Sequence, residues 1–212
     1  MTESERKQII ALVQREVIPA IGCTEPIAVA LCVAKATETL GAKPEKIKVL
    51  LSANILKNAM GVGIPGTGMI GLPIAVALGA LIGKSDYQLE VLKDSSPEAV
   101  EEGKKLIDEK RICISLKENI TEKLYIEVMC EAGGEQATAI ISGGHTTFVY
   151  VAKGDEILLN KQQVSGEEEE EEELELTLRK VYDFALTAPL DEIRFILETA
   201  RLNKKAAEQS FQ

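Results

Sequence analysis

Residues 20–38, AIGCTEPIAVALCVAKATE, contain a long apolar segment that begins directly after a Cys-Thr-Glu-Pro sequence. Proline suits the first turn of a helix, and the residue before a proline avoids helical dihedral angles. The sequence therefore predicts a helix over 26–40 with Glu25 as its N-cap. This helix is apolar nearly all round as far as Ala34, which is typical of a buried helix. We expect it to lie in the core of the fold.

The rest of the chain predicts helices first and strands afterwards. Helices are predicted at 4–18, 70–82 and 96–110, and strands at 46–52, 111–116, 123–130, 136–142, 145–152 and 156–160. Glycine pairs and Gly-Asp between the later strands favour hairpin turns. Helices followed by an antiparallel run indicate the α+β class, with helices packed on a mostly antiparallel sheet.

Charge divides the chain into segments. Residues 167–173 are seven consecutive glutamates, and such a run repels itself and stays solvated. We therefore predict an N-terminal α+β domain at 1–163, an acidic linker at 164–173 and a helical segment at 174–212. The helical segment carries an apolar stripe with little chain to cover it, so we expect it to begin a second helical domain that this chain lacks.

Composition excludes several classes of protein. The chain has 24 basic and 34 acidic residues; without the glutamate run the acidic count is 27 and the net charge only −3, and no basic patch suggests nucleic acid. The uncharged stretch 58–83 holds seven glycines and two prolines, so we expect no membrane span. The charged N-terminus resembles no secretory signal, and the four cysteines lack disulfide spacing, which favours a cytoplasmic protein with reduced thiols.

Cys23 lies just outside the predicted start of the 26–40 helix. Unpaired N–H groups and the helix dipole favour an anion there, which lowers the pKa of a thiol and suits a nucleophile or a metal ligand. The alternative is a small structural cysteine. Cys32, Cys113 and Cys130 lie in apolar helix and strand patterns, and we predict that all three are buried in the core.

Two further segments carry polar groups suited to a ligand. His145, the only histidine, follows two glycines in SGGHTT and could move protons near neutral pH, although it could equally be a turn residue. The loop IPGTGMIGLP, residues 64–73, is neither a Walker nor a Rossmann motif. With Lys57 upstream it would suit a small carboxylate, and the alternative is a tight turn with solvated polar residues.

Several stretches resemble one known family in order over residues 5–205. They are AIGCTEPIAVAL, SANILKNAMGVGIPGTGMIGLPIAVALGAL, LEVLKD, ISGGHT and DEIRFILETARLN. They are similar to the N-terminal half of the L-cysteine desulfidase family, which is related to the serine dehydratase alpha chain.

The resemblance implies a lyase that works without PLP. In that family three cysteines hold a [4Fe–4S] cluster whose open iron acts as a Lewis acid, and the cysteine of the Gly-Cys-Thr-Glu-Pro motif falls on Cys23. L-cysteine would lose hydrogen sulfide, or L-serine water, to give pyruvate and ammonia. The family's other two cluster cysteines lie in a C-terminal half that this chain lacks. We therefore expect a missing half or a second chain as partner, a homo-oligomer, and little activity of the isolated chain.

These inferences assign a role to each candidate residue. Cys23 is the expected metal ligand and His145 the expected catalytic residue for proton transfer. The residues expected to bind substrate are Thr24, Glu25, Asn54, Lys57, Asn58, Pro65, Gly66, Thr67, Gly68 and Thr146. The alternative is a non-catalytic amino-acid-binding or partner-interaction module without the cluster half.

Overall fold

The computed structural model describes residues 1–161 and 175–211. The described chain forms two compact units, residues 20–161 and residues 1–19 with 175–211, and each is described by itself. The predicted linker at 164–173 lies outside the described residues.

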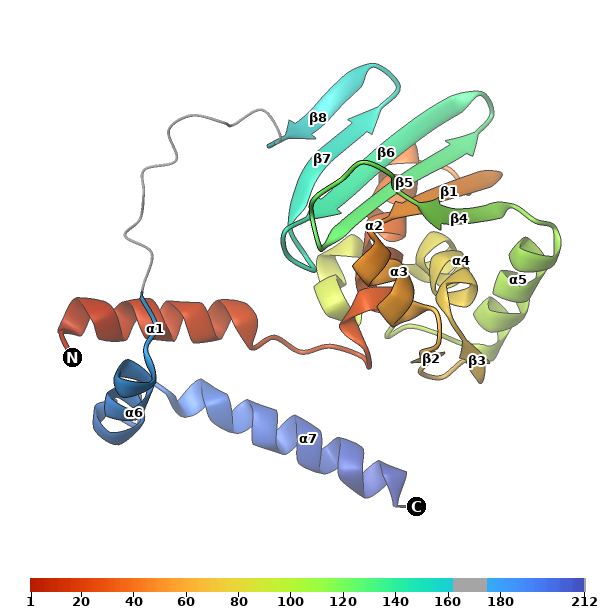
Figure 1. The fold of residues 1–212 in the computed structure, drawn as a ribbon. Coiled ribbons are helices and arrows are strands. Elements are labelled where there is room, and N and C mark those ends of the chain that lie inside the picture. Colours follow the sequence, from red (N-terminus) through yellow and green to blue (C-terminus); the bar gives the residue numbers. More distant parts are fainter. Residues whose placement is uncertain (162–174, 212) are drawn as a thin grey trace. The chain divides into compact units, whose positions relative to one another are not determined.

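Residues 20–161 are built on a six-stranded sheet in the order β4-β1-β5-β6-β7-β8 (Figure 1). Strand β1 pairs with β4 in parallel, and the other four pairs are antiparallel. The strands are β1 Lys46–Leu51, β4 Ile112–Leu116, β5 Tyr125–Ala132, β6 Glu135–Ser142, β7 Phe148–Lys153 and β8 Glu156–Asn160. The predicted α+β class with a mostly antiparallel sheet is confirmed.

The helices of this unit lie on one side of the sheet (Figure 1). They are α2 Thr24–Leu40, α3 Ala53–Ala59, α4 Leu72–Ile82, the 3-10 helix η1 Ser85–Glu90 and α5 Pro97–Asp108. A short hairpin of β2, Gly63–Ile64, and β3, Met69–Ile70, joins α3 to α4.

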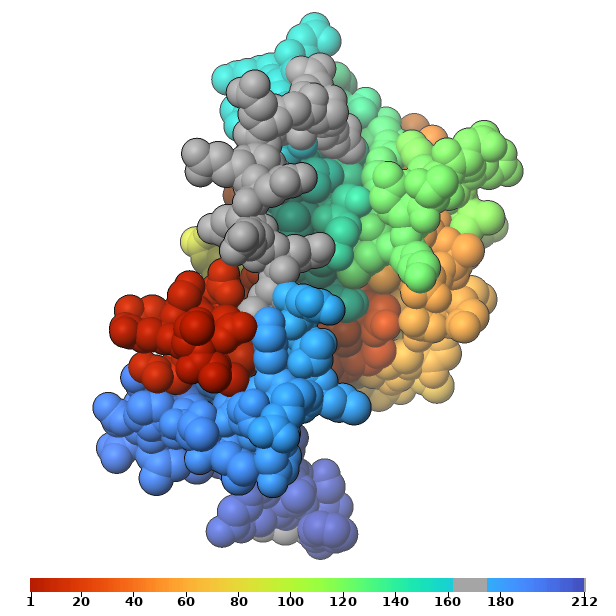
Figure 2. All heavy atoms as spheres, turned by 60° about the vertical axis from the view of Figure 1, so that its left-hand side comes forward, coloured from red at the N-terminus to blue at the C-terminus, as the bar shows by residue number. Residues whose placement is uncertain are grey.

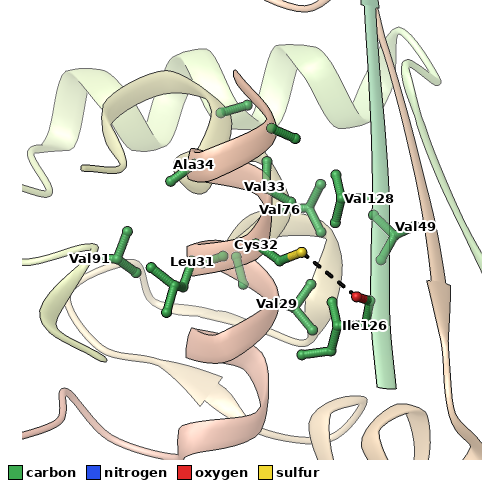
Figure 3. Packing of buried hydrophobic residues seen from close by; sticks show 14 of the residues in the cluster. Val29, Leu31, Cys32, Val33, Ala34, Val49, Val76, Val91, Ile126 and Val128 are labelled. Atoms are coloured by element: carbon green, nitrogen blue, oxygen red, sulfur yellow. Dashed lines mark hydrogen bonds between the residues drawn. The ribbon is translucent and has the colours of Figure 1, made fainter. Parts of the chain in front are cut away.

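Helix α2 lies in the centre of the core, as predicted. It is buried continuously from Pro26 to Ala34, and it packs against α4 and against strands β5, β6 and β7. Figure 3 shows residues of α2 close to Val76 of α4 and to Ile126 and Val128 of β5. Helix α4 approaches α2 closely because Gly79 has no side chain; a Cβ there would lie 2.6 Å from the Ala30 carbonyl oxygen. Cys32 is fully buried, and its thiol lies 3.3 Å from the Ala139 carbonyl oxygen.

Two local predictions are wrong. The N-cap of α2 is Cys23 rather than Glu25, and the helix begins at Thr24. Pro26 is accommodated at the third helical position because the first-turn N–H groups have no partner within the helix. Cys113 is exposed rather than buried, because β4 directs Ile112 and Ile114 toward the core and Cys113 to the opposite face.

Residues 1–19 and 175–211 contain α1 Glu3–Glu16, α6 Leu178–Thr187, the 3-10 helix η2 Arg194–Ile196 and α7 Leu197–Ser210. Arg6 pairs with Glu192 at 2.9 Å, and Lys180 with Glu5 at 3.1 Å. The atoms of α6 and α7 are the blue spheres in Figure 2. Several of their apolar side chains are exposed, among them Val181, Leu186 and Leu202. Leu178 is 90% exposed and Leu197 67%, so an apolar face is present, as the sequence indicated.

Within the described residues, no helix is both long enough and apolar enough to cross a membrane. The most apolar one, α4, has only 11 residues.

Candidate functional site

The segment before α2 is held in place by two contacts. The Ile21 N–H donates to the Leu89 carbonyl oxygen at 3.2 Å, and Gly22 has a positive φ of 76°. A Cβ at Gly22 would lie 3.0 Å from Cγ of Pro65, so the β2–β3 hairpin packs directly against this glycine. These contacts fix the chain immediately before Cys23.

The first residues of α2 form a hydrogen-bonded cluster around the Glu25 carboxylate. The Cys23 thiol donates to Oε2 of Glu25 at 2.9 Å, and the Thr24 hydroxyl donates to the same oxygen at 3.3 Å. Asn58 Nδ2 donates to Oε1 of Glu25 at 3.2 Å. The Thr24 hydroxyl also lies 3.4 Å from Nε2 of His145. We call these five residues the Glu25 cluster; all five are half-buried.

His145 reaches the cluster from the turn between β6 and β7. The turn is closed by hydrogen bonds from the Ser142 N–H to the Thr147 carbonyl oxygen and from the Thr147 N–H to the Gly144 carbonyl oxygen. Strand β7 begins at Phe148, so His145 is a turn residue and not part of the strand predicted from 145. Helix α2 packs against β6 and β7. The first helical turn of α2 therefore lies next to the β6–β7 turn.

Asn58 reaches the cluster from α3, which the sequence did not predict. This helix has only seven residues, and its apolar residues Ile55 and Ala59 are buried. Ile55 and Ala59 are four residues apart and therefore lie on the same face of α3. With this face buried, the Asn58 side chain is directed toward the start of α2. Two polar side chains, from α3 and from the β6–β7 turn, thus converge on the first turn of α2.

The pKa of Cys23 contradicts the sequence-based expectation. Burial raises the pKa of the thiol, and the hydrogen bond to the Glu25 carboxylate raises it further. The backbone N–H of Glu25, at the start of the helix, lowers the pKa of the thiol, but by less than burial and the carboxylate raise it. The thiol is therefore a protonated donor in this arrangement. The same hydrogen bond from Cys23, with help from Asn58 and from nearby His145, lowers the pKa of Glu25.

The glycine-rich segment forms a hairpin rather than an open anion-binding loop. The Thr67 hydroxyl donates to the Ile64 carbonyl oxygen at 2.7 Å and accepts from the Met69 N–H at 3.0 Å. Gly66 and Gly68 have positive φ, which the turn requires. The Thr67 side chain is thus engaged in the turn, whereas Pro65 faces the segment before Cys23.

Three other predicted residues form no side-chain hydrogen bond or ion pair with the Glu25 cluster. Asn54 lines a separate hollow of about 550 Å³ together with the 116–123 loop. Lys57 is exposed and forms no ion pair with the described residues, and the Thr146 hydroxyl forms no hydrogen bond with them.

The described residues supply one thiol to the site. Cys32 and Cys130 are buried in the core, and Cys113 is exposed on the sheet. No group of three or more His, Cys, Asp or Glu side chains in the described chain is arranged to hold a metal ion. A cluster that needs three thiolates therefore does not fit these residues alone.

Sequence reasoning missed the residues that support the site. Leu89 lies in the LEVLKD stretch, and its carbonyl oxygen anchors Ile21. The preceding residue, Gln88, has φ 50° and ψ −127°, a conformation that non-glycine residues rarely adopt. No residue type at 88 signals this conformation, because glutamine is unremarkable in helices and turns.

Comparison with known proteins gives close relatives. The chain is 96% identical over 212 residues to a UPF0597 protein of Bacteroides fragilis. It is 78% identical over 212 residues to a UPF0597 protein of Bacteroides thetaiotaomicron and 48% over 218 residues to one of Porphyromonas gingivalis. Each alignment covers the whole chain but only 50%, 49% and 50% of these relatives, respectively, so the chain spans about half the length of the curated relatives it matches.

The names of the UPF0597 relatives state no activity, substrate or cofactor. No protein-family model matches the chain, and no solved structure matches it.

Proposed function

We propose that the chain is part of an iron–sulfur-dependent lyase that eliminates hydrogen sulfide from L-cysteine, or water from L-serine, without PLP. The products are pyruvate and ammonia. Cys23 is one ligand of a [4Fe–4S] cluster, whose open iron would supply Lewis-acid chemistry. The remaining ligands come from the other half of the relatives' length or from a second chain. A cytoplasmic, homo-oligomeric enzyme remains our expectation.

One observation carries the proposal. Cys23 and His145 are 122 residues apart in numbering, and Thr24, next to Cys23 in the chain, lies within 3.4 Å of the His145 ring. A thiol and a group able to transfer protons therefore meet at one half-buried site, which an elimination reaction requires. The motifs that carry the family resemblance, GCTEP and SGGHT, supply these two groups.

The chain's own residues can account for the proton transfer. In a β-elimination, a base takes the α-proton while the bond from the β-carbon to sulfur or oxygen breaks, and the leaving group departs as hydrogen sulfide or water once protonated. A neutral His145 ring could accept the α-proton. The aminoacrylate that remains tautomerises to an imine, which water hydrolyses to pyruvate and ammonia. The half-buried setting limits the access of bulk water to the first step.

A second candidate function is a non-catalytic amino-acid-binding module. The observation that favours it is the donor set: the described residues supply one thiol, and its pKa is raised by burial and by Glu25. Such a module would bind the amino acid at the Glu25 cluster and release no sulfide.

The test is turnover by the full-length Bacteroides fragilis relative, purified and reconstituted with iron and sulfide without oxygen. We expect L-cysteine-dependent release of sulfide and pyruvate, with a loss of at least about 100-fold when the cysteine matching Cys23 is changed to alanine. The matched control is Cys113→Ala, which removes an exposed thiol from the sheet and should keep full activity. Undiminished turnover in Cys23→Ala would contradict the ligand assignment, and binding without turnover in the wild type would favour the module.

A further inference from the structure

We propose that the Glu25 carboxylate binds the α-ammonium group of the amino-acid ligand. This inference rests on the proposed function, and it assigns to one residue the recognition of an amino acid rather than of any small acid. It also orients the ligand relative to His145.

The first observation is that no lysine or arginine pairs with Glu25 among the described residues. Its three hydrogen-bond donors are a thiol, a hydroxyl and an amide, from Cys23, Thr24 and Asn58. Among the ion pairs of the described residues, none includes Glu25. The carboxylate charge is therefore not balanced by a lysine or arginine.

Two other glutamates of the same unit, half-buried Glu127 and exposed Glu38, have different partners. Glu127 pairs with Lys117 at 2.6 Å and also accepts from the Tyr125 hydroxyl at 2.8 Å. Glu38 lacks a cation but accepts the N–H and hydroxyl of Ser85, and it thereby joins α2 to the start of η1. Glu25, in contrast to Glu127, has no cation, and its hydrogen-bond donors are neutral side chains.

The second observation is the set of acceptors around this charge. An ammonium group carries three N–H donors and needs acceptors on one side. Asn58 uses its Nδ2 toward Glu25, so its Oδ1 has no hydrogen-bond partner among the described residues. The Thr24 oxygen lies beside the carboxylate and can accept as well. The cluster thus offers acceptor oxygens that match the N–H donors of a primary ammonium.

The position of Thr24 gives the ligand its orientation. The Thr24 hydroxyl touches Glu25 at 3.3 Å on one side and His145 at 3.4 Å on the other. The α-carbon is one bond away from the ammonium nitrogen. An amino acid held at Glu25 therefore brings its α-proton toward His145, and its own carboxylate is directed away from the Glu25 charge.

The experiment compares two ligands that differ in the amino group, L-serine and 3-hydroxypropionate, by calorimetric titration of the full chain. We expect the wild type to bind L-serine at least about tenfold more tightly, because a hydrogen-bonded charge pair contributes this much. Glu25→Gln should remove this preference, and Glu25→Asp, which keeps the charge, should retain part of it. The matched control is Glu45→Gln, which removes one exposed charge from the same unit and should leave the preference unchanged.

Two outcomes overturn the inference. One is a preference for L-serine that survives in a folded Glu25→Gln chain; the other is a wild type that shows no preference for the amino group. Sulfide release by the full-length relative reports independently on the proposed function. If turnover depends on Cys23 while the ligand preference does not depend on Glu25, only the ammonium assignment fails.

Discussion

At the scale of single residues, Cys23 is under two opposing influences. The helix start favours a thiolate, as the sequence indicated, and the backbone N–H of Glu25 acts in that direction. Burial and the Glu25 carboxylate outweigh it and raise the pKa of the thiol. Burial and the Glu25 side chain together thus set the protonation state, and neither the burial of Cys23 nor the direction of the Glu25 side chain is visible in the sequence.

Gly22 is the residue that we expect to tolerate substitution least in the segment before α2. Gly22→Ala would place a Cβ 3.0 Å from Pro65 at a φ of 76°. We predict a loss of about 1–3 kcal/mol in the free energy of unfolding, measured by urea denaturation. Gly61→Ala is the control, because its Cβ meets nothing within 4 Å and its φ is not in the left-handed region. An equal loss in both variants would contradict the close approach of the hairpin.

The four cysteines should differ in reactivity toward Ellman's reagent. In the folded chain we expect rapid reaction at exposed Cys113 and slower reaction at half-buried Cys23. Cys32 and Cys130 should react only after unfolding, since both have 0% exposure and burial raises the pKa of Cys130 to about 11. The count of modified thiols in native and denaturing buffer checks this. Modification of Cys32 or Cys130 in the native chain would show that α2 does not pack as described.

At the scale of elements, the packing of α4 on α2 depends on one glycine. Gly79→Ala would place a Cβ 2.6 Å from the Ala30 carbonyl oxygen, which is backbone and cannot move alone. We predict a loss of about 1–3 kcal/mol in the free energy of unfolding.

A second helical glycine provides the control for this prediction. A Cβ at Gly103 in α5 would meet the end of the Ile74 side chain at 3.0 Å, which can shift. Alanine there also gains up to about 1 kcal/mol of helix propensity, so the net change in stability should be small. Thermal unfolding of both variants checks the pair, and a Gly79→Ala chain as stable as the wild type would contradict the α2–α4 contact.

The elements themselves were largely predictable. The apolar run after Cys23, the alternation in β5 and the Ser96-Pro97 start of α5 each carry a local signal, and each corresponds to an observed element. Helix α3 was missed because seven residues give too little periodicity to distinguish a helix from a loop. The prediction that Cys113 is buried was wrong, because apolar residues precede and follow it in the sequence. Which residues of the edge strand β4 are buried depends on which face of the strand other elements cover.

The candidate site was predictable as a set of residues but not as an arrangement. Cys23 and His145 were recognised as chemically suited groups from their own neighbours. Their meeting at Thr24 depends on α2 packing under β6 and β7, which is a property of the whole unit. Asn54 and Asn58 looked equivalent in the sequence, yet only Asn58 contacts Glu25.

At the scale of the whole molecule, the chain supplies part of what the proposed lyase needs. The unit of residues 20–161 holds a thiol, a carboxylate, an amide and an imidazole in one cluster. The other unit exposes apolar residues such as Leu178 of α6 and Leu190 of the turn after α6, and the relatives are about twice as long as the chain. We therefore propose that the further cluster ligands belong to that additional length.

We propose that the start of α2 and the β6–β7 turn form one catalytic site. A double-mutant cycle in the full-length Bacteroides fragilis relative tests it through the rate of pyruvate formation, with changes at the positions matching Thr24 and His145. We predict that Thr24→Val lowers the rate about tenfold and His145→Asn at least about 100-fold. Because the two residues act through one contact, the double variant should be only about as slow as His145→Asn alone. Losses that simply multiply in the double variant would contradict a shared site.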